Sequence, residues 1–175
     1  DYATVVSEVS RVTASRLERF DRLTDLWSDL EGPTLIYCAS PPSARRVAAA
    51  LAASGRRPVL DTLQGAADWV ASNYHEDWTL VRSLRRGIGL HHGKVPRAIQ
   101  QYFVRAFNDG SLNTLVCTST LIEGVNTKAK NVIVFDNRVA MSKFDFFTFN
   151  NIKGRSGRMF QHFVGRVFLF NYPPQ

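Results

Sequence analysis

The stretch TLIYCASPPSARRVAAALAASG, residues 34–55, decides the fold class. Its first residues, Thr34 to Cys38, form a short apolar run bounded by turn residues, which is typical of a buried strand. Pro41 and Pro42 favour the start of a helix directly after it, and Gly55 favours its end. The stretch therefore predicts one β-strand followed by one α-helix.

The same alternation continues toward the C-terminus. Apolar runs predict further strands over residues 88–90, 114–117, 132–135 and 166–170. Helical spacing and helix-start signals predict further helices over residues 62–74, 77–86, 96–110 and 142–152. Strands that are apolar throughout and separated by helices indicate a parallel sheet covered on both faces, so the predicted class is α/β.

The N-terminal segment is different, because no strand signal stands out there. Val5, Val9 and Val12, and then Leu17 onward, recur at helical spacing until Gly32-Pro33. This pattern predicts a helical arm over residues 1–31. The predicted organisation is then an arm of residues 1–31 and one α/β domain of residues 32–175.

Composition excludes several classes of protein. With 45% hydrophobic and 21% charged residues the chain is of ordinary globular type, which argues against disorder and collagen-like repeats. It has no apolar run of about 18 residues and no signal-peptide core, so we expect a cytoplasmic protein with no membrane partner. Cys38 and Cys117 lie in apolar runs and are expected to be buried, reduced thiols with no disulfide or metal.

The positive charge is unevenly distributed. The net charge is +7, and residues 82–105 hold six basic residues and no acidic one. Such a segment is typical of a protein that binds a polyanion. The alternative is a solvated basic face without a partner.

Segment LIYCAS, residues 35–40, ends a predicted strand on Ser40 and continues into a helix. The free N–H groups and positive end of that helix suit a phosphate group. The alternative is that Ser40 only caps the helix.

Segment GIGLHHGKVPR, residues 87–97, supplies glycines, His91, His92, Lys94 and Arg97. Because two histidines without a third ligand make a poor zinc site, we interpret it as a packed turn that borders a polyanion.

Segment TSTLIEGVN, residues 118–126, follows another strand end. The Thr118 hydroxyl could bind phosphate, Gly124 permits close approach of a ligand, and Asn126 offers a donor and an acceptor. The alternative is a loop whose hydroxyl groups satisfy its own backbone.

Segment NIKGRSGR, residues 151–158, places Arg155 and Arg158 three residues apart after Gly154. On a helical turn both guanidinium groups lie on one face and could jointly neutralise a phosphoryl group. The alternative is a surface pair that forms ordinary salt bridges.

Taken in order, the four segments resemble motifs IV, IVa, V and VI of the second RecA-like domain of superfamily-two helicases. The HHG, T-S-T-L-I-E-G-V-N and G-R-S-G-R strings most resemble the DExH branch that includes exosome-associated RNA helicases and archaeal repair DNA helicases. The resemblance covers about residues 33–171 and implies a RecA-like fold.

The resemblance also implies a role for each segment. Arg155 and Arg158 would act as arginine fingers on ATP. Other residues would line the nucleotide, namely Gly124, Asn126, Asn151 and Gly154. A further set would bind the DNA or RNA backbone, namely Ser40, His92, Arg97 and Thr118.

Two catalytic strings of such helicases do not occur in the 175 residues, namely G-x-x-x-x-G-K-[ST] and D-E-x-H/D. The resemblance therefore implies that ATP and Mg²⁺ also need a first RecA-like domain of the same polypeptide, ahead of Asp1, and that this segment alone does not hydrolyse ATP. The alternative is a nonenzymatic nucleic-acid-binding module.

Two departures from the family pattern affect the expected mechanism. Asn151 replaces the glutamine that opens motif VI, so its nucleotide contact could differ. Only about residues 136–142 are available where relatives carry a strand-separating hairpin, which favours a translocase that remodels complexes without unwinding as a further alternative.

Overall fold

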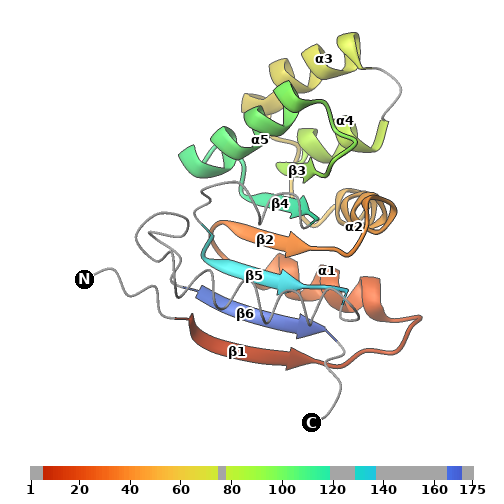
Figure 1. The fold of residues 1–175 in the computed structure, drawn as a ribbon, viewed down its shortest axis with the longest axis vertical. Helices are drawn as coiled ribbons and strands as arrows, with labels where there is room; N and C mark the ends of the chain where they lie inside the picture. The colour runs from red at the N-terminus through yellow and green to blue at the C-terminus, as the bar shows by residue number, and fades with distance from the viewer. Residues whose placement is uncertain (1–5, 75–77, 119–128, 137–164, 171–175) are drawn as a thin grey trace.

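The computed structural model describes residues 6–74, 78–118, 129–136 and 165–170. They form a six-stranded sheet in the order β1-β6-β5-β2-β4-β3, and every strand pair is parallel (Figure 1). The strands are β1 (Val6–Val12), β2 (Thr34–Tyr37), β3 (Ile88–His91), β4 (Thr114–Cys117), β5 (Asn131–Val134) and β6 (Gly165–Phe170). The predicted α/β, RecA-like parallel sheet is confirmed.

Helices connect the strands. They are α1 (Arg19–Asp29), α2 (Pro41–Ala53), α3 (Gln64–Asn73), α4 (Trp78–Arg85) and α5 (Arg97–Asp109), with a 3-10 turn over Asp61–Leu63 ahead of α3. The predicted helix boundaries agree with the observed ones because proline and glycine residues start and end the helices as expected. Pro41 occupies the first turn of α2, and Gly110 ends α5 in the left-handed conformation with φ of 88°. The helix predicted near residues 142–152 lies outside the described residues.

The core has two halves, one on each face of the sheet. Side chains of a strand alternate between faces, so Leu35 packs in the cluster that contains α3, α4 and α5 residues, whereas Ile36 packs in the cluster that contains α1 and α2 residues. In the register of the central strands, Leu35 lies between Leu115 of β4 and Val132 of β5. This burial on both faces explains why the strands are apolar throughout.

The prediction of a helical arm over residues 1–31 is wrong for residues 6–12, which form β1. Val9 pairs with Val167 of β6, more than 150 residues further along the chain. The valine spacing that suggested a helix also fits this strand, and only a non-local partner decides between the two. Helix α1 lies in the second part of the predicted arm, and Trp27 on it is fully buried, with its indole N–H donating to the Thr114 hydroxyl at 2.9 Å.

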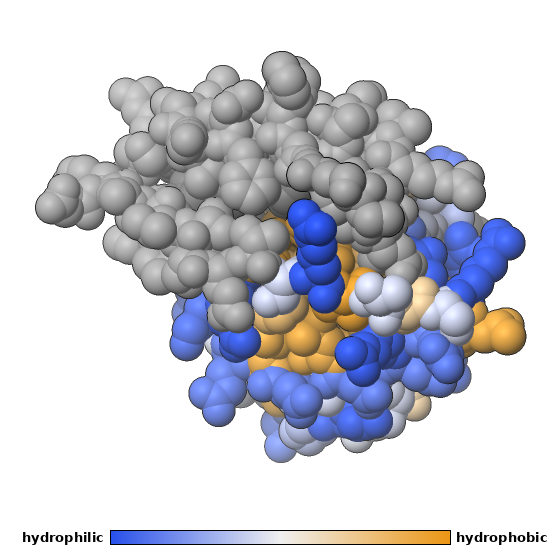
Figure 2. All heavy atoms as spheres, turned by 90° about the horizontal axis from the view of Figure 1, so that it is seen from below, coloured by the Kyte–Doolittle hydropathy of each residue, from blue (hydrophilic) through white to orange (hydrophobic). Residues whose placement is uncertain are grey.

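The edge of the sheet that carries β1 is seen in Figure 2, where apolar surface is framed by hydrophilic side chains. Among the described residues, no helix is long and apolar enough to cross a membrane.

Candidate nucleic-acid interface

The carboxyl ends of β2, β4 and β3 lie side by side in the sheet. Backbone hydrogen bonds join them beyond the strands themselves, from Cys38 N–H to the Cys117 carbonyl at 2.8 Å and from Thr118 N–H to the His91 carbonyl at 3.1 Å. The segments that contain Ser40, Thr118 and His92 therefore meet at one edge of the sheet. We call this edge the carboxyl edge; it is where parallel α/β sheets usually bind ligands.

Ser40 is the N-terminal cap of α2. Its hydroxyl oxygen accepts a hydrogen bond from the Ser43 N–H at 3.3 Å. The helix-capping role considered for Ser40 is thus observed. A hydroxyl group can also donate one hydrogen bond, so capping leaves Ser40 with a donor for a phosphate oxygen.

Asp136, which lies two residues after the end of β5, is also at this edge, and sequence reasoning gave it no role. Its carboxylate accepts hydrogen bonds from the Ala39 N–H at 2.8 Å and the Ser43 hydroxyl at 2.6 Å. Arg19 approaches the other carboxylate oxygen at 3.4 Å and lies 4.2 Å from the centre of the Phe135 ring. An internal carboxylate therefore already occupies the positive end of α2. The available signal was an acidic residue immediately after an apolar strand.

His92 organises the turn between β3 and α5. Its ring nitrogen Nδ1 accepts from the Lys94 N–H at 3.1 Å, and its carbonyl accepts from the Gln100 side chain at 2.7 Å and from the Val95 N–H at 3.0 Å. The His92 side chain is buried, whereas Lys94 and Arg97 are exposed. The turn therefore presents two cations at the carboxyl edge, with His92 holding its shape.

The neighbouring His91 is the last residue of β3 and is also buried. Burial, with a smaller contribution from His92, lowers the pKa of its imidazole below the ordinary value. Thr118, at the end of β4, is buried as well, with 4% of its surface exposed. Of the residues that the family pattern assigns to nucleic-acid binding, Arg97 is therefore exposed at this edge, whereas His92 and Thr118 are buried.

The basic segment 82–105 does not form one continuous face. Arg85 and Arg86 precede β3, and Lys94 and Arg97 follow it, so the two pairs lie toward opposite ends of that strand. Arg85 forms a salt bridge with Asp68 at 2.6 Å and a hydrogen bond with Gln64. Arg86 donates to the Arg57 carbonyl at 2.8 Å. Only the second pair belongs to the carboxyl edge.

Both cysteines are free and buried, as the sequence predicted. Burial raises the pKa of the Cys117 thiol, and burial together with the Asp136 charge raises that of Cys38. Within the described ranges, no group of three His, Cys, Asp or Glu side chains could hold a metal ion.

The predicted nucleotide-side residues lie outside the described residues and stay predictions. They are Gly124, Asn126, Asn151, Gly154, Arg155 and Arg158.

Comparison with known proteins identifies the family. Residues 64–167 match the helicase conserved C-terminal domain. The chain belongs to this helicase family. The helicase C-terminal domain is the second RecA-like domain of superfamily-two helicases, as the motif order indicated.

Individual relatives agree with this assignment. The helicase domain is 49% identical over 142 residues to anti-bacteriophage protein B of Escherichia coli K12, covering 81% of the chain and 19% of that protein. It is 41% identical over 71 residues to the ATP-dependent RNA helicase mtr4 of Schizosaccharomyces pombe, covering 41% of the chain and 6% of that protein.

A solved structure shares the fold. Saccharomyces cerevisiae Dbp5 bound to RNA and ADP BeF3 matches with a TM-score of 0.59 at 17% identity, over 97% of this chain and 36% of Dbp5. The chain thus spans less than a fifth of the two curated relatives and about a third of this structure.

Proposed function

We propose that this helicase domain is the second motor domain of an ATP-dependent nucleic-acid helicase or translocase, and that its carboxyl edge binds the backbone of DNA or RNA. The observation that carries the proposal is the hydrogen-bonded alignment of the β2, β4 and β3 ends, which brings Ser40, Thr118 and the His92 turn together. Dbp5, which shares the fold, is described as bound to RNA and ADP BeF3.

The nucleic-acid contacts would be made mainly by exposed groups. Lys94 and Arg97 would neutralise backbone phosphates, and the Ser40 hydroxyl would donate to a neighbouring phosphate oxygen. Thr118 is buried, so its part is to hold the β4 end against His91, and a direct phosphate contact would need the residues around it to move. Such contacts recognise the backbone and are independent of base sequence.

The proposed contacts with the nucleotide are inferred from the family pattern and from residue chemistry. Arg155 and Arg158 would stabilise charge on the transferred phosphoryl group, while Gly124, Asn126, Asn151 and Gly154 would line the nucleotide. ATP and Mg²⁺ would be held together with a first RecA-like domain of the same polypeptide. The two free, buried cysteines are compatible with the cytoplasmic location that we also propose.

The N-terminal segment would link the two motor domains. Residues 1–31 would lead from the first domain into the domain of residues 32–175, with β1 forming the edge strand of the sheet beside β6 and α1 packed on one face. The relationship to anti-bacteriophage protein B suggests that the complete protein acts in defence against phage.

The test is ATP hydrolysis by the full-length protein, with and without saturating single strand. We expect strand-stimulated hydrolysis, and we expect Ser40→Ala to weaken the stimulation while basal hydrolysis persists, because the substitution removes one phosphate hydrogen bond. Absence of hydrolysis by the full-length protein would favour the nonenzymatic binding module.

A strand-displacement assay on the same protein separates the remaining alternatives. Strand-stimulated hydrolysis without displacement would identify a translocase that remodels complexes without unwinding.

A further inference from the structure

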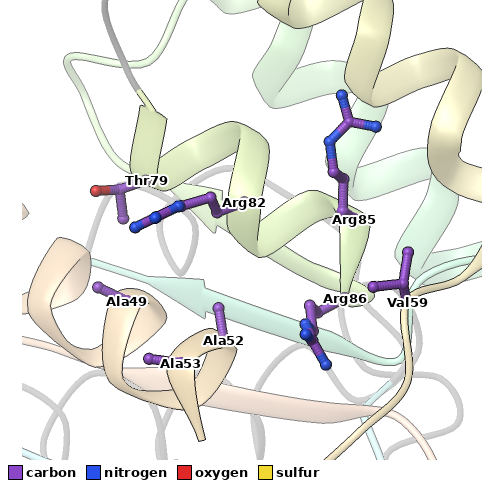
Figure 3. A pocket seen from close by; sticks show the side chains of 8 residues that line it. All are labelled: Ala49, Ala52, Ala53, Val59, Thr79, Arg82, Arg85 and Arg86. Atoms are coloured by element: carbon purple, nitrogen blue, oxygen red, sulfur yellow. The ribbon is translucent and has the colours of Figure 1, made fainter. Parts of the chain in front are cut away.

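An open pocket of about 380 Å³ lies between α2 and α4, away from the carboxyl edge (Figure 3). Helix α2 and the segment before α3 provide small apolar side chains, and α4 with the residue after it provides polar and cationic ones. The lining residues are Ala49, Ala52, Ala53, Val59, Thr79, Arg82, Arg85 and Arg86. None of the proposed strand or nucleotide contacts is among them, so this pocket is a separate feature of the domain.

The cations of the pocket come from the second half of α4 and from the residue that follows it. Arg82 and Arg85 lie in α4, and Arg86 comes directly after its last residue. In Figure 3 the side chains of Arg82 and Arg86 extend toward α2, whereas that of Arg85 points away from it. The pocket thus has a guanidinium group toward each end and an alanine, Ala52, between them.

These cations differ in how far they are already neutralised. Arg85 is paired with Asp68 at 2.6 Å, and Arg86 uses one terminal nitrogen on the neutral carbonyl of Arg57. Arg82 is exposed, and within the described part of the chain it forms no salt bridge. Among the described residues, no acidic side chain neutralises Arg82 or Arg86, so two positive charges face the pocket.

The floor is apolar. Ala49, Ala52 and Ala53 contribute methyl groups at successive turns of α2, and Val59 is 47% exposed beside them. None of the described lining residues is aromatic, so none of them offers a ring on which a nucleic-acid base could stack. A ligand that satisfies this pocket needs a small apolar group for the floor and anionic groups for the two arginines.

We propose that the pocket binds an acidic peptide segment of a protein partner, with an apolar side chain against the alanines and carboxylates paired with Arg82 and Arg86. Arginine–carboxylate pairs are charge-assisted and can be bidentate, which suits recognition of acidic segments by arginine clusters. Because the pocket and the carboxyl edge share no residue, the partner and the nucleic acid can bind at the same time.

The experiment measures fluorescence anisotropy of a fluorescein-labelled dodecapeptide, in which two central leucines are flanked by glutamates, on the full-length protein. Arg82→Glu should weaken binding by about tenfold or more, since it replaces an attractive charged pair by a repulsive one. Ala52→Glu, which puts a carboxylate on the floor, should do the same. Replacing the leucines by serines should also weaken binding, because apolar burial is lost.

The matched control is Arg105→Glu, an equal charge change at an exposed position on α5. It should leave peptide affinity unchanged, and all three variants should keep wild-type basal ATP hydrolysis. Equal weakening by Arg82→Glu and Arg105→Glu, or no saturable peptide binding at millimolar concentration, would overturn the proposal. So would loss of oligothymidylate affinity in Arg82→Glu together with displacement of the peptide by that strand, since the pocket would then belong to the nucleic-acid path.

Discussion

The carboxylate of Asp136 accepts a 2.6 Å hydrogen bond from the hydroxyl group of Ser43. The same carboxylate oxygen accepts a hydrogen bond from the Ala39 N–H at 2.8 Å. One side chain shortly after β5 therefore fixes the segment that leads into α2 and the first turn of that helix. A negative charge thus stands beside Ser40, where the family pattern places a backbone phosphate. We therefore expect this arrangement to affect both stability and the proposed binding of nucleic acid.

Asp136→Ala should lower the free energy of unfolding by roughly 1–3 kcal/mol, because it leaves the partly buried Ser43 hydroxyl and the exposed Ala39 N–H without their charged acceptor. Urea denaturation followed by fluorescence of the buried Trp27 measures the change. The matched control is Asp68→Ala, which removes an exposed salt bridge and should cost less than about 1 kcal/mol. Equal losses in the two variants would show that the Asp136 contacts contribute no more than a surface pair.

Asp136→Asn should strengthen single-strand binding by the full-length protein, by up to about fivefold. The amide oxygen can still accept hydrogen bonds, while the negative charge that repels a phosphate is removed. Affinity is measured by anisotropy at low salt, and the gain should shrink as salt is added. A weaker affinity instead would mean that the carboxylate itself supports strand binding.

Arg155→Ala and Arg158→Ala should each reduce the rate of ATP hydrolysis by the full-length protein by roughly 10³ to 10⁵, as for other arginine fingers, because they remove charge stabilisation from the transition state. Strand affinity measured in parallel should persist. If both variants retained near wild-type turnover, the assignment of this motif to catalysis would fail.

Lys94→Ala and Arg97→Ala should each flatten the dependence of strand affinity on salt, lowering the slope of log affinity against log salt by about one. Both side chains are exposed at the carboxyl edge. Arg105→Ala serves as the control, since it removes an equal charge from the later part of α5 and should leave the slope nearly unchanged. Equal slopes in all three variants would point to a diffuse attraction by net charge.

His91 should make the protein less stable in mild acid. Burial lowers its pKa in the folded state below the ordinary value of 6.5, so the unfolded chain binds more protons once the pH falls to about 6.5. Stability should therefore fall as the pH drops below that value and level off below the folded-state pKa. Urea midpoints at pH 8 and pH 5 measure the effect, and His91→Leu should show a smaller difference between them.

Most of the fold was predictable because its signals are local. Short apolar runs between prolines and glycines mark β2, β3, β4 and β5 to within a residue or two. Strand β1 could not be recognised in this way. Its valines fit helical spacing, and its only sheet neighbour in the described structure is β6 at the far end of the sequence.

For the candidate site, the sequence predicted which strand ends carry the residues, but not which side chains contact each other there. The sequence predicted that Ser40, Thr118 and His92 follow strand ends, and in the sheet these three strands, β2, β4 and β3, are neighbours. The charge pattern along the sequence could not show that β3 separates Arg85 from Arg97. It also could not show that Asp136 accepts hydrogen bonds at the start of α2. Both depend on three-dimensional arrangement, which no local pattern encodes.

The pairing of β1 with β6 also sets an order of events during synthesis on the ribosome. Within this domain, β1 cannot complete its pairing with β6 until Phe170 has emerged, because Val12 pairs with that residue. At typical rates of translation, roughly ten to thirty seconds pass between the synthesis of β1 and that of β6. Throughout that interval the nascent chain exposes a valine-rich segment, so this stretch is the part of the domain on which a chaperone would act first.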